Sequence, residues 1–302
     1  MCTGQLERVF RQIIHSEEAI VCGAEVASGV KNPLLPYKLN LYISKMLSGK
    51  NIVIIGGTSG IGLAAAQEFK SRGANVVVAG KQGSSAEVLR FFPRNLIIEG
   101  DATSPSFSTD SISTCVKEFG KLDGLYHVAG GSGRSLGDGP LHELTLEGWH
   151  KTFELNLTSL MLSNQAAVKQ FLPQGSGGAI LNISSVLAYS PSPNYFSTHA
   201  YAAAKSAVIG FSKSIASYYA SKNIRVNVIA PALVDSPMAT RAVSNEPIQS
   251  FIKTKQPLDG GRVSNPDDLT GLACYFMSDA SKFTTGQVVA VDGGWSITDG
   301  QL

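Results

Sequence analysis

Short apolar runs alternate with longer amphipathic segments from about residue 48 to the C-terminus. Each run is rich in β-branched residues and apolar throughout, which is typical of a strand buried on both faces of a parallel sheet. The predicted strands are 51–55, 75–79, 96–99, 124–129, 179–183, 225–229 and 287–291. The predicted helices between them are 60–72, 107–119, 145–172, 199–220 and 266–278. This alternation predicts a Rossmann-type, doubly wound α/β fold, with one parallel sheet of about seven strands flanked by helices.

The first 45 residues follow a different pattern. Apolar residues at helical spacing predict an amphipathic helix over 5–22, and glycine and proline interrupt the pattern after it. The polar side of this helix has no excess of lysine or arginine, so we expect it to pack on protein rather than on a membrane. We therefore divide the chain into an N-terminal extension, 1–45, and a single folded domain, 46–302.

Composition and charge narrow the class of protein. The chain has 25 lysine and arginine residues against 23 acidic residues, and this net charge of +2 gives no general attraction to nucleic acid or anionic membranes. Its four cysteines lie far apart, and no metal-ligand cluster is evident. Neither a signal-peptide core nor an apolar run of membrane-spanning length is present. We expect a cytoplasmic protein without a metal, a nucleic-acid partner or a membrane partner.

A glycine-rich segment directly follows the first predicted strand. Glycines let a backbone turn sharply and approach a pyrophosphate, which then lies at the N-terminus of the following helix. A glycine cluster alone is weak evidence, but here a predicted strand precedes it and a predicted helix follows. The expected nucleotide-binding residues are Gly56, Thr58, Ser59, Gly60, Ile61 and Gly62.

Tyr201 and Lys205 lie four residues apart at the start of the helix predicted over 199–220. This spacing puts both side chains on one helix face, where an ammonium favours the phenolate and lowers its pKa from about 10. Such a phenol can exchange a proton with a carbonyl or an alcohol. Tyr218 and Lys222 repeat the spacing at the far end of the helix, away from the carboxyl ends of the strands, and we interpret them as helix surface.

The GxxxGxG spacing of the glycine segment and the Tyr201–Lys205 pair resemble the short-chain dehydrogenase/reductase family over about residues 46–300. The resemblance implies that Tyr201, Lys205, Ser185 and Asn156 are the catalytic residues. Tyr201 is then the acid/base, and Lys205 tunes it and binds the nicotinamide ribose. Ser185 orients the substrate oxygen, and Asn156 supports the proton path through a water molecule.

Two departures from the family pattern concern this site. Ile55 stands where the family has threonine, which affects a turn contact rather than a catalytic atom. Ser185 precedes Tyr201 by 16 residues, more than the family usually shows, and the extra residues fall in a predicted loop at the pocket mouth. Ser184 is therefore kept as the alternative serine.

The resemblance also implies cofactor contacts at the carboxyl ends of three further strands. These are Asp101 and Ala102 after the third strand, Ala129 and Gly130 after the fourth, and Pro231, Val234 and Ser236 after the sixth. The first pair is expected at the adenine, and the last group at the nicotinamide carboxamide. His127 replaces a family asparagine, and we interpret it as a structural substitute rather than a catalytic base.

The end of the second strand bears on the choice of cofactor. An acidic side chain there would bind the ribose of NAD and repel the 2′-phosphate of NADP, but Gly80 holds that position. Lys81 is available to neutralise a 2′-phosphate, although a solvated surface lysine is the ordinary alternative. We predict that NADP(H) is favoured over NAD(H).

The predicted function is hydride transfer between a nicotinamide cofactor and a carbonyl or secondary alcohol, favoured as NADPH-dependent ketone reduction. The alternatives are an NAD-dependent alcohol dehydrogenase, an epimerase or dehydratase, and a nucleotide-binding regulatory protein on the same fold. A small-molecule substrate is expected, under a cover formed by 236–262. Arg134 could meet an anionic substrate, but an arginine of this kind is more often solvated or paired with a local acid such as Asp138. Family analogy implies a homodimer or homotetramer through 145–172 and 199–220.

Overall fold

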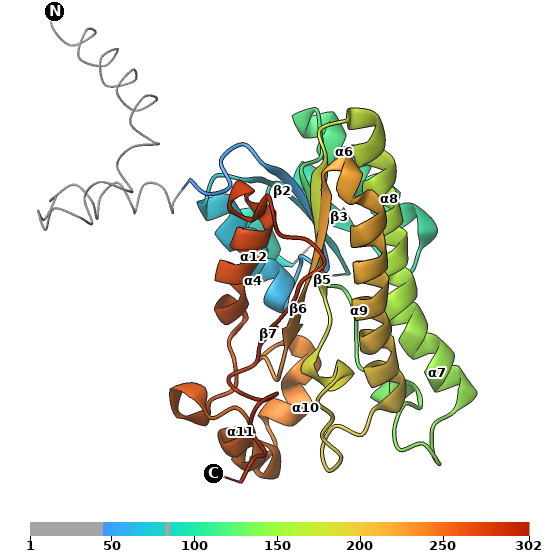
Figure 1. Cartoon of the computed structure of the whole chain (residues 1–302), viewed down its shortest axis with the longest axis vertical. Coiled ribbons are helices and arrows are strands. Elements are labelled where there is room, and N and C mark those ends of the chain that lie inside the picture. Colours follow the sequence, from blue (N-terminus) through green and yellow to red (C-terminus); the bar gives the residue numbers. More distant parts are fainter. Residues whose placement is uncertain (1–44, 82–84, 302) are drawn as a thin grey trace, which may run out of the picture. The chain divides into compact units, whose positions relative to one another are not determined.

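The computed structural model describes residues 45–81 and 85–301, so the helix predicted over 5–22 lies outside the described residues. Within these ranges, seven parallel strands form one sheet in the order β3-β2-β1-β4-β5-β6-β7 (Figure 1). The strands are β1 (Asn51–Ile55), β2 (Asn75–Gly80), β3 (Ile97–Glu99), β4 (Gly124–His127), β5 (Gly178–Ile183), β6 (Ile224–Pro231) and β7 (Val288–Val291). The predicted doubly wound fold is confirmed.

Helices cover both faces of the sheet (Figure 1). One face carries α4 (Gly60–Ser71), α5 (Ala86–Phe91) and α12 (Thr270–Met277), and the other carries α6 (Pro105–Phe119), α8 (Ser159–Gln174) and α9 (His199–Tyr219). Successive residues of β1 belong to opposite apolar clusters: Ile52 and Ile54 pack under α4, whereas Val53 and Ile55 pack under α6. Both sides of the strand are therefore buried, which explains its uninterrupted apolar run.

The helix predicted over 145–172 differs most from the structure. It consists of α7 (Leu146–Phe153), a π-helical turn η3 (Glu154–Thr158) and α8. The Asn156 side chain donates a 2.9 Å hydrogen bond to the carbonyl oxygen of Thr152, one turn earlier. A side-chain amide that bonds to the backbone in this way competes with regular helical bonding, and π turns often occur at functional sites.

Smaller differences lie at element ends. Strand β4 ends at His127 rather than residue 129, because the amides of Val128 and Ala129 both bond to the Ile55 carbonyl oxygen and turn the chain. The helix predicted over 266–278 is a 3-10 turn, η8 (Pro266–Leu269), followed by α12. In the described parts of the chain, no helix is both long enough and apolar enough to cross a bilayer.

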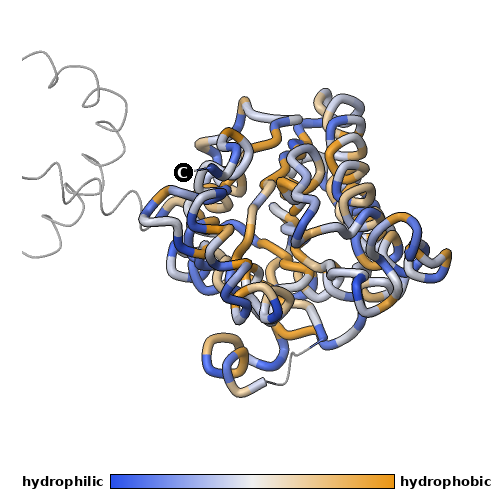
Figure 2. The backbone as a smooth tube through the Cα atoms, turned by 90° about the horizontal axis from the view of Figure 1, so that it is seen from below, coloured by the Kyte–Doolittle hydropathy of each residue, from blue (hydrophilic) through white to orange (hydrophobic). Residues whose placement is uncertain are grey.

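A third apolar cluster lies beyond the carboxyl ends of the strands. Residues 236–262 contain α10 (Thr240–Val243) and α11 (Glu246–Lys255), and the Asn245 side chain caps α11 by accepting a bond from the Ile248 amide. Ile248 and Ile252 pack there around the buried Trp295. Figure 2 views the molecule from this end, with the apolar strands surrounded by helices of mixed polarity. The expected cover is thus a packed helical segment beside the site.

Candidate active site

The glycine-rich turn between β1 and α4 packs closely against the backbone that follows β4. Gly56 has a φ of +86°, and a Cβ there would lie 2.5 Å from the Ala129 nitrogen. A Cβ on Gly62 would lie 2.0 Å from the Gly56 carbonyl oxygen. Only glycine fits at these contacts, so α4 begins directly against the end of β1 and next to the end of β4.

Helix α4 presents an open N-terminus to the cavity at this turn. No side chain caps the helix, and its first turn contains no acidic residue. Its first amides and the positive end of its dipole are therefore available to an anion. A cavity of about 330 Å³ lies here, and its lining includes Gly60, Ile61, Ala129 and Gly130. The open helix end and the glycine cradle fit a dinucleotide pyrophosphate.

Most of the predicted cofactor residues line this cavity. They are Gly56, Thr58, Ser59, Gly60, Ile61, Lys81, Asp101, Ala102, Ala129, Gly130 and Ser236. Residues that were not among the predicted cofactor contacts also line it: Gly100, Thr103, Val128 and Leu155, with Pro237 and Met238 from the predicted cover. Of the remainder, Gly62 packs α4 on the turn, Pro231 is buried at the end of β6, and Val234 bridges to Ser264.

The four predicted catalytic residues come together behind this cavity. Asn156, Lys205, Ser185 and Tyr201 are all buried, with exposed fractions of 0, 3, 7 and 8%. The Lys205 Nζ lies 5.6 Å from the centre of the Tyr201 ring and donates a 3.0 Å hydrogen bond to the Ile183 carbonyl oxygen. Ser185 lies beside the Tyr201 side chain.

The structure distinguishes the two candidate serines. Ser184 donates a 2.7 Å hydrogen bond to the backbone carbonyl oxygen of Lys205 and so ties β5 to α9. Ser185 instead accepts a 3.2 Å bond from the Leu187 amide and contacts the phenol of Tyr201. The geometry therefore favours Ser185 over Ser184 as the serine beside the Tyr201 phenol.

The protonation states of Tyr201 and Lys205 differ from the sequence prediction. Burial raises the pKa of Tyr201 to about 12, although the hydrogen bond with Ser185 opposes this shift. Burial also lowers the pKa of Lys205 to about 8. Loss of solvation decides the direction of the Tyr201 shift, and the charge of Lys205 is not among its causes. The prediction that Lys205 lowers the pKa of Tyr201 is therefore wrong.

Asn156 joins the π turn to the loop after β4. Its side chain accepts a 3.1 Å hydrogen bond from the Gly131 amide and donates a 2.8 Å bond to the Gly131 carbonyl oxygen. A Cβ on Gly130 would lie 2.7 Å from the Asn156 Oδ1 and 3.4 Å from the Lys205 Nζ. Gly130 thus lies close to both the Asn156 amide and the Lys205 ammonium.

Asp138 is a site residue that sequence reasoning did not identify. It is 3% exposed, and its two carboxylate oxygens accept 2.9 Å hydrogen bonds from the amides of Ala200 and Tyr201. Thr198, which precedes α9, makes no capping bond with its side chain, so Asp138 caps the helix from a distant loop. Pairing of Arg134 with Asp138 is therefore wrong. In the sequence, Asp138 is an acidic residue between two glycines in a predicted loop. This pattern does not specify which residue the acid binds.

His127 is buried between the sheet and α8. Its ring nitrogens lie 3.0 Å from the Ala129 carbonyl oxygen and 2.8 Å from the Ser163 hydroxyl. Burial and the charge of Lys205 lower its pKa to about 3, so the ring is neutral at pH 7. These contacts support the structural interpretation of His127.

Lys81 and Asp101 form an ion pair at the other end of the cavity. Their charged atoms lie 2.8 Å apart, with side chains 65% and 44% exposed. The pair and hydrogen bonds from Thr103 lower the pKa of Asp101 to about 2. A Cβ on Gly80 would lie only 2.3 Å from the Thr58 Oγ1, so Thr58 occupies the space of any side chain there.

Known protein families and individual proteins resemble most of the folded domain. Residues 55–296 match the protein family described as enoyl-(acyl carrier protein) reductase. The chain is 32% identical over 248 residues to cis-4-hydroxycyclohexanecarboxylate dehydrogenase of Sinomonas cyclohexanicum, covering 81% of this chain and 95% of that protein. It is 33% identical to the 3-oxoacyl-(acyl-carrier-protein) reductase of Chlamydia trachomatis over 262 residues, covering 83% and 99%.

Solved structures agree with the sequence relatives. A short-chain type dehydrogenase/reductase from Mycobacterium ulcerans superposes with a TM-score of 0.74 at 27% identity, covering 83% of this chain and 91% of that structure. Levodione reductase superposes with a TM-score of 0.72 at 25% identity, covering 82% and 98%. The chain belongs to the short-chain dehydrogenase/reductase family. It is an NAD(P)-dependent oxidoreductase, and the predictions of family and enzyme class are confirmed.

Proposed function

We propose that this enzyme uses NADPH to reduce a ketone in a small molecule, in a reversible reaction. The position of Gly80 carries the cofactor proposal. An acidic side chain there would repel a 2′-phosphate, but Thr58 fills the space that its Cβ needs. Lys81 lies at the rim of the same cavity and supplies a positive charge.

When bound, the nicotinamide supplies a hydride to the carbonyl carbon. The Tyr201 hydroxyl donates its proton to the carbonyl oxygen, so the C=O double bond becomes a C–O single bond with new C–H and O–H bonds. The raised pKa keeps this phenol protonated at neutral pH, which is the form required for reduction. Ser185 donates a hydrogen bond to the same oxygen. Lys205 returns a proton to Tyr201 and is itself resupplied from solvent through a water held by Asn156.

A second candidate, NAD-dependent alcohol oxidation, is favoured by the Lys81–Asp101 ion pair. Asp101 neutralises the lysine and places a carboxylate at the adenosine end of the cavity. A 2′-phosphate would have to displace this carboxylate, whereas a ribose hydroxyl could donate a hydrogen bond to it. An exposed pair of this kind contributes little free energy, about 0–1 kcal/mol, so we place the NADPH proposal first.

Fluorescence titration of the purified protein with NADPH and with NADH tests the cofactor proposal. We expect tighter binding of NADPH, weakened about fivefold to tenfold in Lys81→Ala because one phosphate contact is lost. Lys117→Ala is the matched control, since Lys117 is an exposed lysine outside the cavity lining. Tighter binding of NADH, unchanged in Lys81→Ala, would favour the second candidate.

We also propose a cytoplasmic enzyme that assembles as a homodimer or homotetramer through α7, α8 and α9. Exposed apolar side chains on the two longer helices, Leu172 at 45% and Tyr218 at 77%, support this proposal. Light scattering of the purified protein measures its molar mass, and a monomer would contradict the assembly.

A further inference from the structure

Two arginines from separate segments converge on one backbone oxygen. The Nη2 atom of Arg134, in the loop after β4, lies 3.5 Å from the Tyr195 carbonyl oxygen. The Nη2 atom of Arg241, in α10, lies 3.3 Å from the same oxygen. The two guanidiniums therefore share one neutral acceptor and leave most of their donors for another group.

Within the part of the chain that the structure describes, neither guanidinium forms an ion pair with an acid. Every ion pair among residues 45–81 and 85–301 involves other side chains. Asp138, the acid four residues after Arg134, is committed to the N-terminus of α9. Partial burial and the nearby charge of Arg134 lower the pKa of Arg241, which indicates two positive charges close together. Like charges held this close are stabilised by an anion between them.

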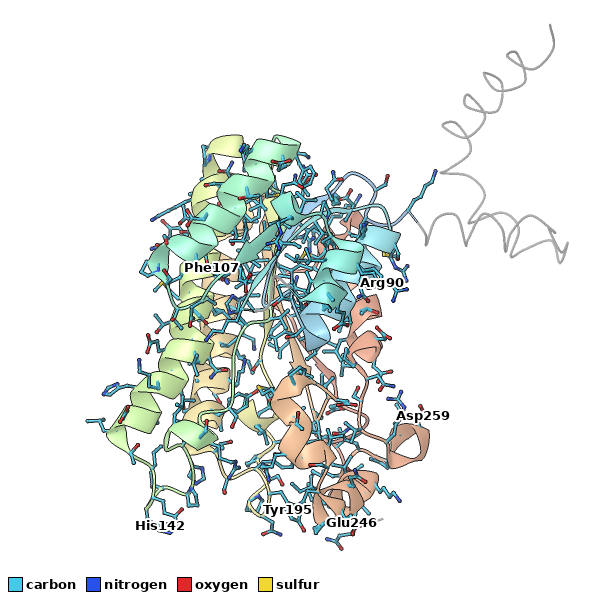
Figure 3. All side chains as sticks on the ribbon, turned by 180° about the vertical axis from the view of Figure 1, so that it is seen from behind. Arg90, Phe107, His142, Tyr195, Glu246 and Asp259 are labelled. Atoms are coloured by element: carbon cyan, nitrogen blue, oxygen red, sulfur yellow. The ribbon has the colours of Figure 1, made fainter. Side chains whose placement is uncertain are left out.

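The arginine pair lies beside the candidate active site. Tyr195 belongs to the loop between Ser185 and Tyr201, and its ring packs 5.3 Å from that of Phe251 in α11. Figure 3 places Tyr195 and Glu246, the first residue of α11, at the same end of the molecule. Arg134 and Arg241 follow cavity-lining residues by only a few positions, since Gly130 precedes one and Met238 the other.

We propose that Arg134 and Arg241 form a subsite that binds a carboxylate of the substrate, remote from the carbonyl that is reduced. The preferred substrate is then a keto acid, or in reverse a hydroxy acid. Each guanidinium can donate to one carboxylate oxygen. This inference rests on the proposed ketone reduction, whose substrate it narrows.

A pair of probes of matched shape tests the subsite. The enzyme is assayed with NADPH and either 4-acetylbenzoate or its neutral analogue 4-acetylbenzamide. We expect kcat/KM to be at least tenfold higher for the acid. In the double variant Arg134→Gln/Arg241→Gln this ratio falls to within about twofold of one, while kcat/KM for the amide stays within twofold of the wild-type value. Arg90→Gln, an exposed arginine on α5, retains the wild-type ratio.

A direct binding measurement separates failure of the subsite from failure of the proposed reaction. Calorimetric titration of the wild-type enzyme with 4-acetylbenzoate in the presence of cofactor should give a Kd at least tenfold lower than for the double variant. If neither probe is reduced but this difference is observed, the subsite stands and ketone reduction is in error. The subsite is overturned if the wild-type enzyme and the double variant bind 4-acetylbenzoate with equal Kd. It is also overturned if the double variant loses turnover of the acid and of the amide to the same extent.

Discussion

The backbone amide of Tyr201 donates a 2.9 Å hydrogen bond to the Asp138 carboxylate. The second oxygen of that carboxylate accepts an equivalent bond from Ala200, so one buried acid fixes the first turn of α9. Tyr201 lies in this first turn, and the position of its phenol depends on where the helix begins. Asp138 therefore positions Tyr201, the residue that we propose as the proton donor, through the backbone of α9.

Replacement of Asp138 by alanine should lower both stability and turnover. The variant leaves two amides of α9 without a partner, and loss of a cap of this kind costs about 1–2 kcal/mol. We expect a lower Tm and a decrease in kcat of about tenfold, with Asp138→Asn intermediate because its amide oxygen still accepts one bond. Asp110→Ala on the exposed side of α6 is the control. A normal kcat in folded Asp138→Ala would show that the cap does not position Tyr201.

Replacement of Gly130 by alanine should reduce activity more than it reduces stability. The new Cβ would enter the space between Asn156 and Lys205, which lie 2.7 and 3.4 Å from its position. Displacement of either side chain should lower kcat by tenfold or more, since misplacement of catalytic groups by about 1 Å can cost about 100-fold. Gly210→Ala, where a Cβ meets nothing within 4 Å, is the control in steady-state assays. Equal activity of the two variants would contradict the assignment of this contact.

Replacement of Asp101 by asparagine should strengthen binding of NADPH. The substitution removes the negative charge that now neutralises Lys81, without changing the size of the side chain. Because an exposed ion pair contributes up to about 1 kcal/mol, we expect a decrease in Kd for NADPH of up to about fivefold. Binding of NADH should be unchanged or weaker, and added salt should reduce the difference. Weaker binding of NADPH would place Asp101 in direct contact with that cofactor.

The buried lysine should make stability depend on pH in the alkaline range. Burial lowers the pKa of Lys205 from 10.5 to about 8, so between these values the unfolded chain binds more protons than the folded protein. The free energy of unfolding contributed by this group therefore rises with pH, by on the order of 2 kcal/mol from pH 8 to pH 10. Urea denaturation of wild-type protein and Lys205→Met across this range measures the difference. A constant difference would mean that Lys205 stays charged when buried.

The features that could be predicted from the sequence are those set by residues close together along the chain. Strands buried on both faces are uninterrupted apolar runs, and Tyr201 and Lys205 lie on one turn of one helix, so both could be recognised along the chain. Contacts between distant segments could not be recognised. The Asp138–Tyr201 bond spans 63 positions, and the Lys81–Asp101 pair joins the ends of two strands. The pKa of Tyr201 was also out of reach, because burial decides it and spacing does not reveal burial.

The central claim is that Tyr201 donates the proton during NADPH-dependent ketone reduction. The most direct test follows consumption of NADPH by the wild-type enzyme and by Tyr201→Phe, with the best substrate from a panel of ketones, while binding of NADPH is measured on both. We predict that Tyr201→Phe binds NADPH normally and reduces the ketone about 10²–10⁴-fold more slowly. Normal turnover by Tyr201→Phe would contradict the assignment.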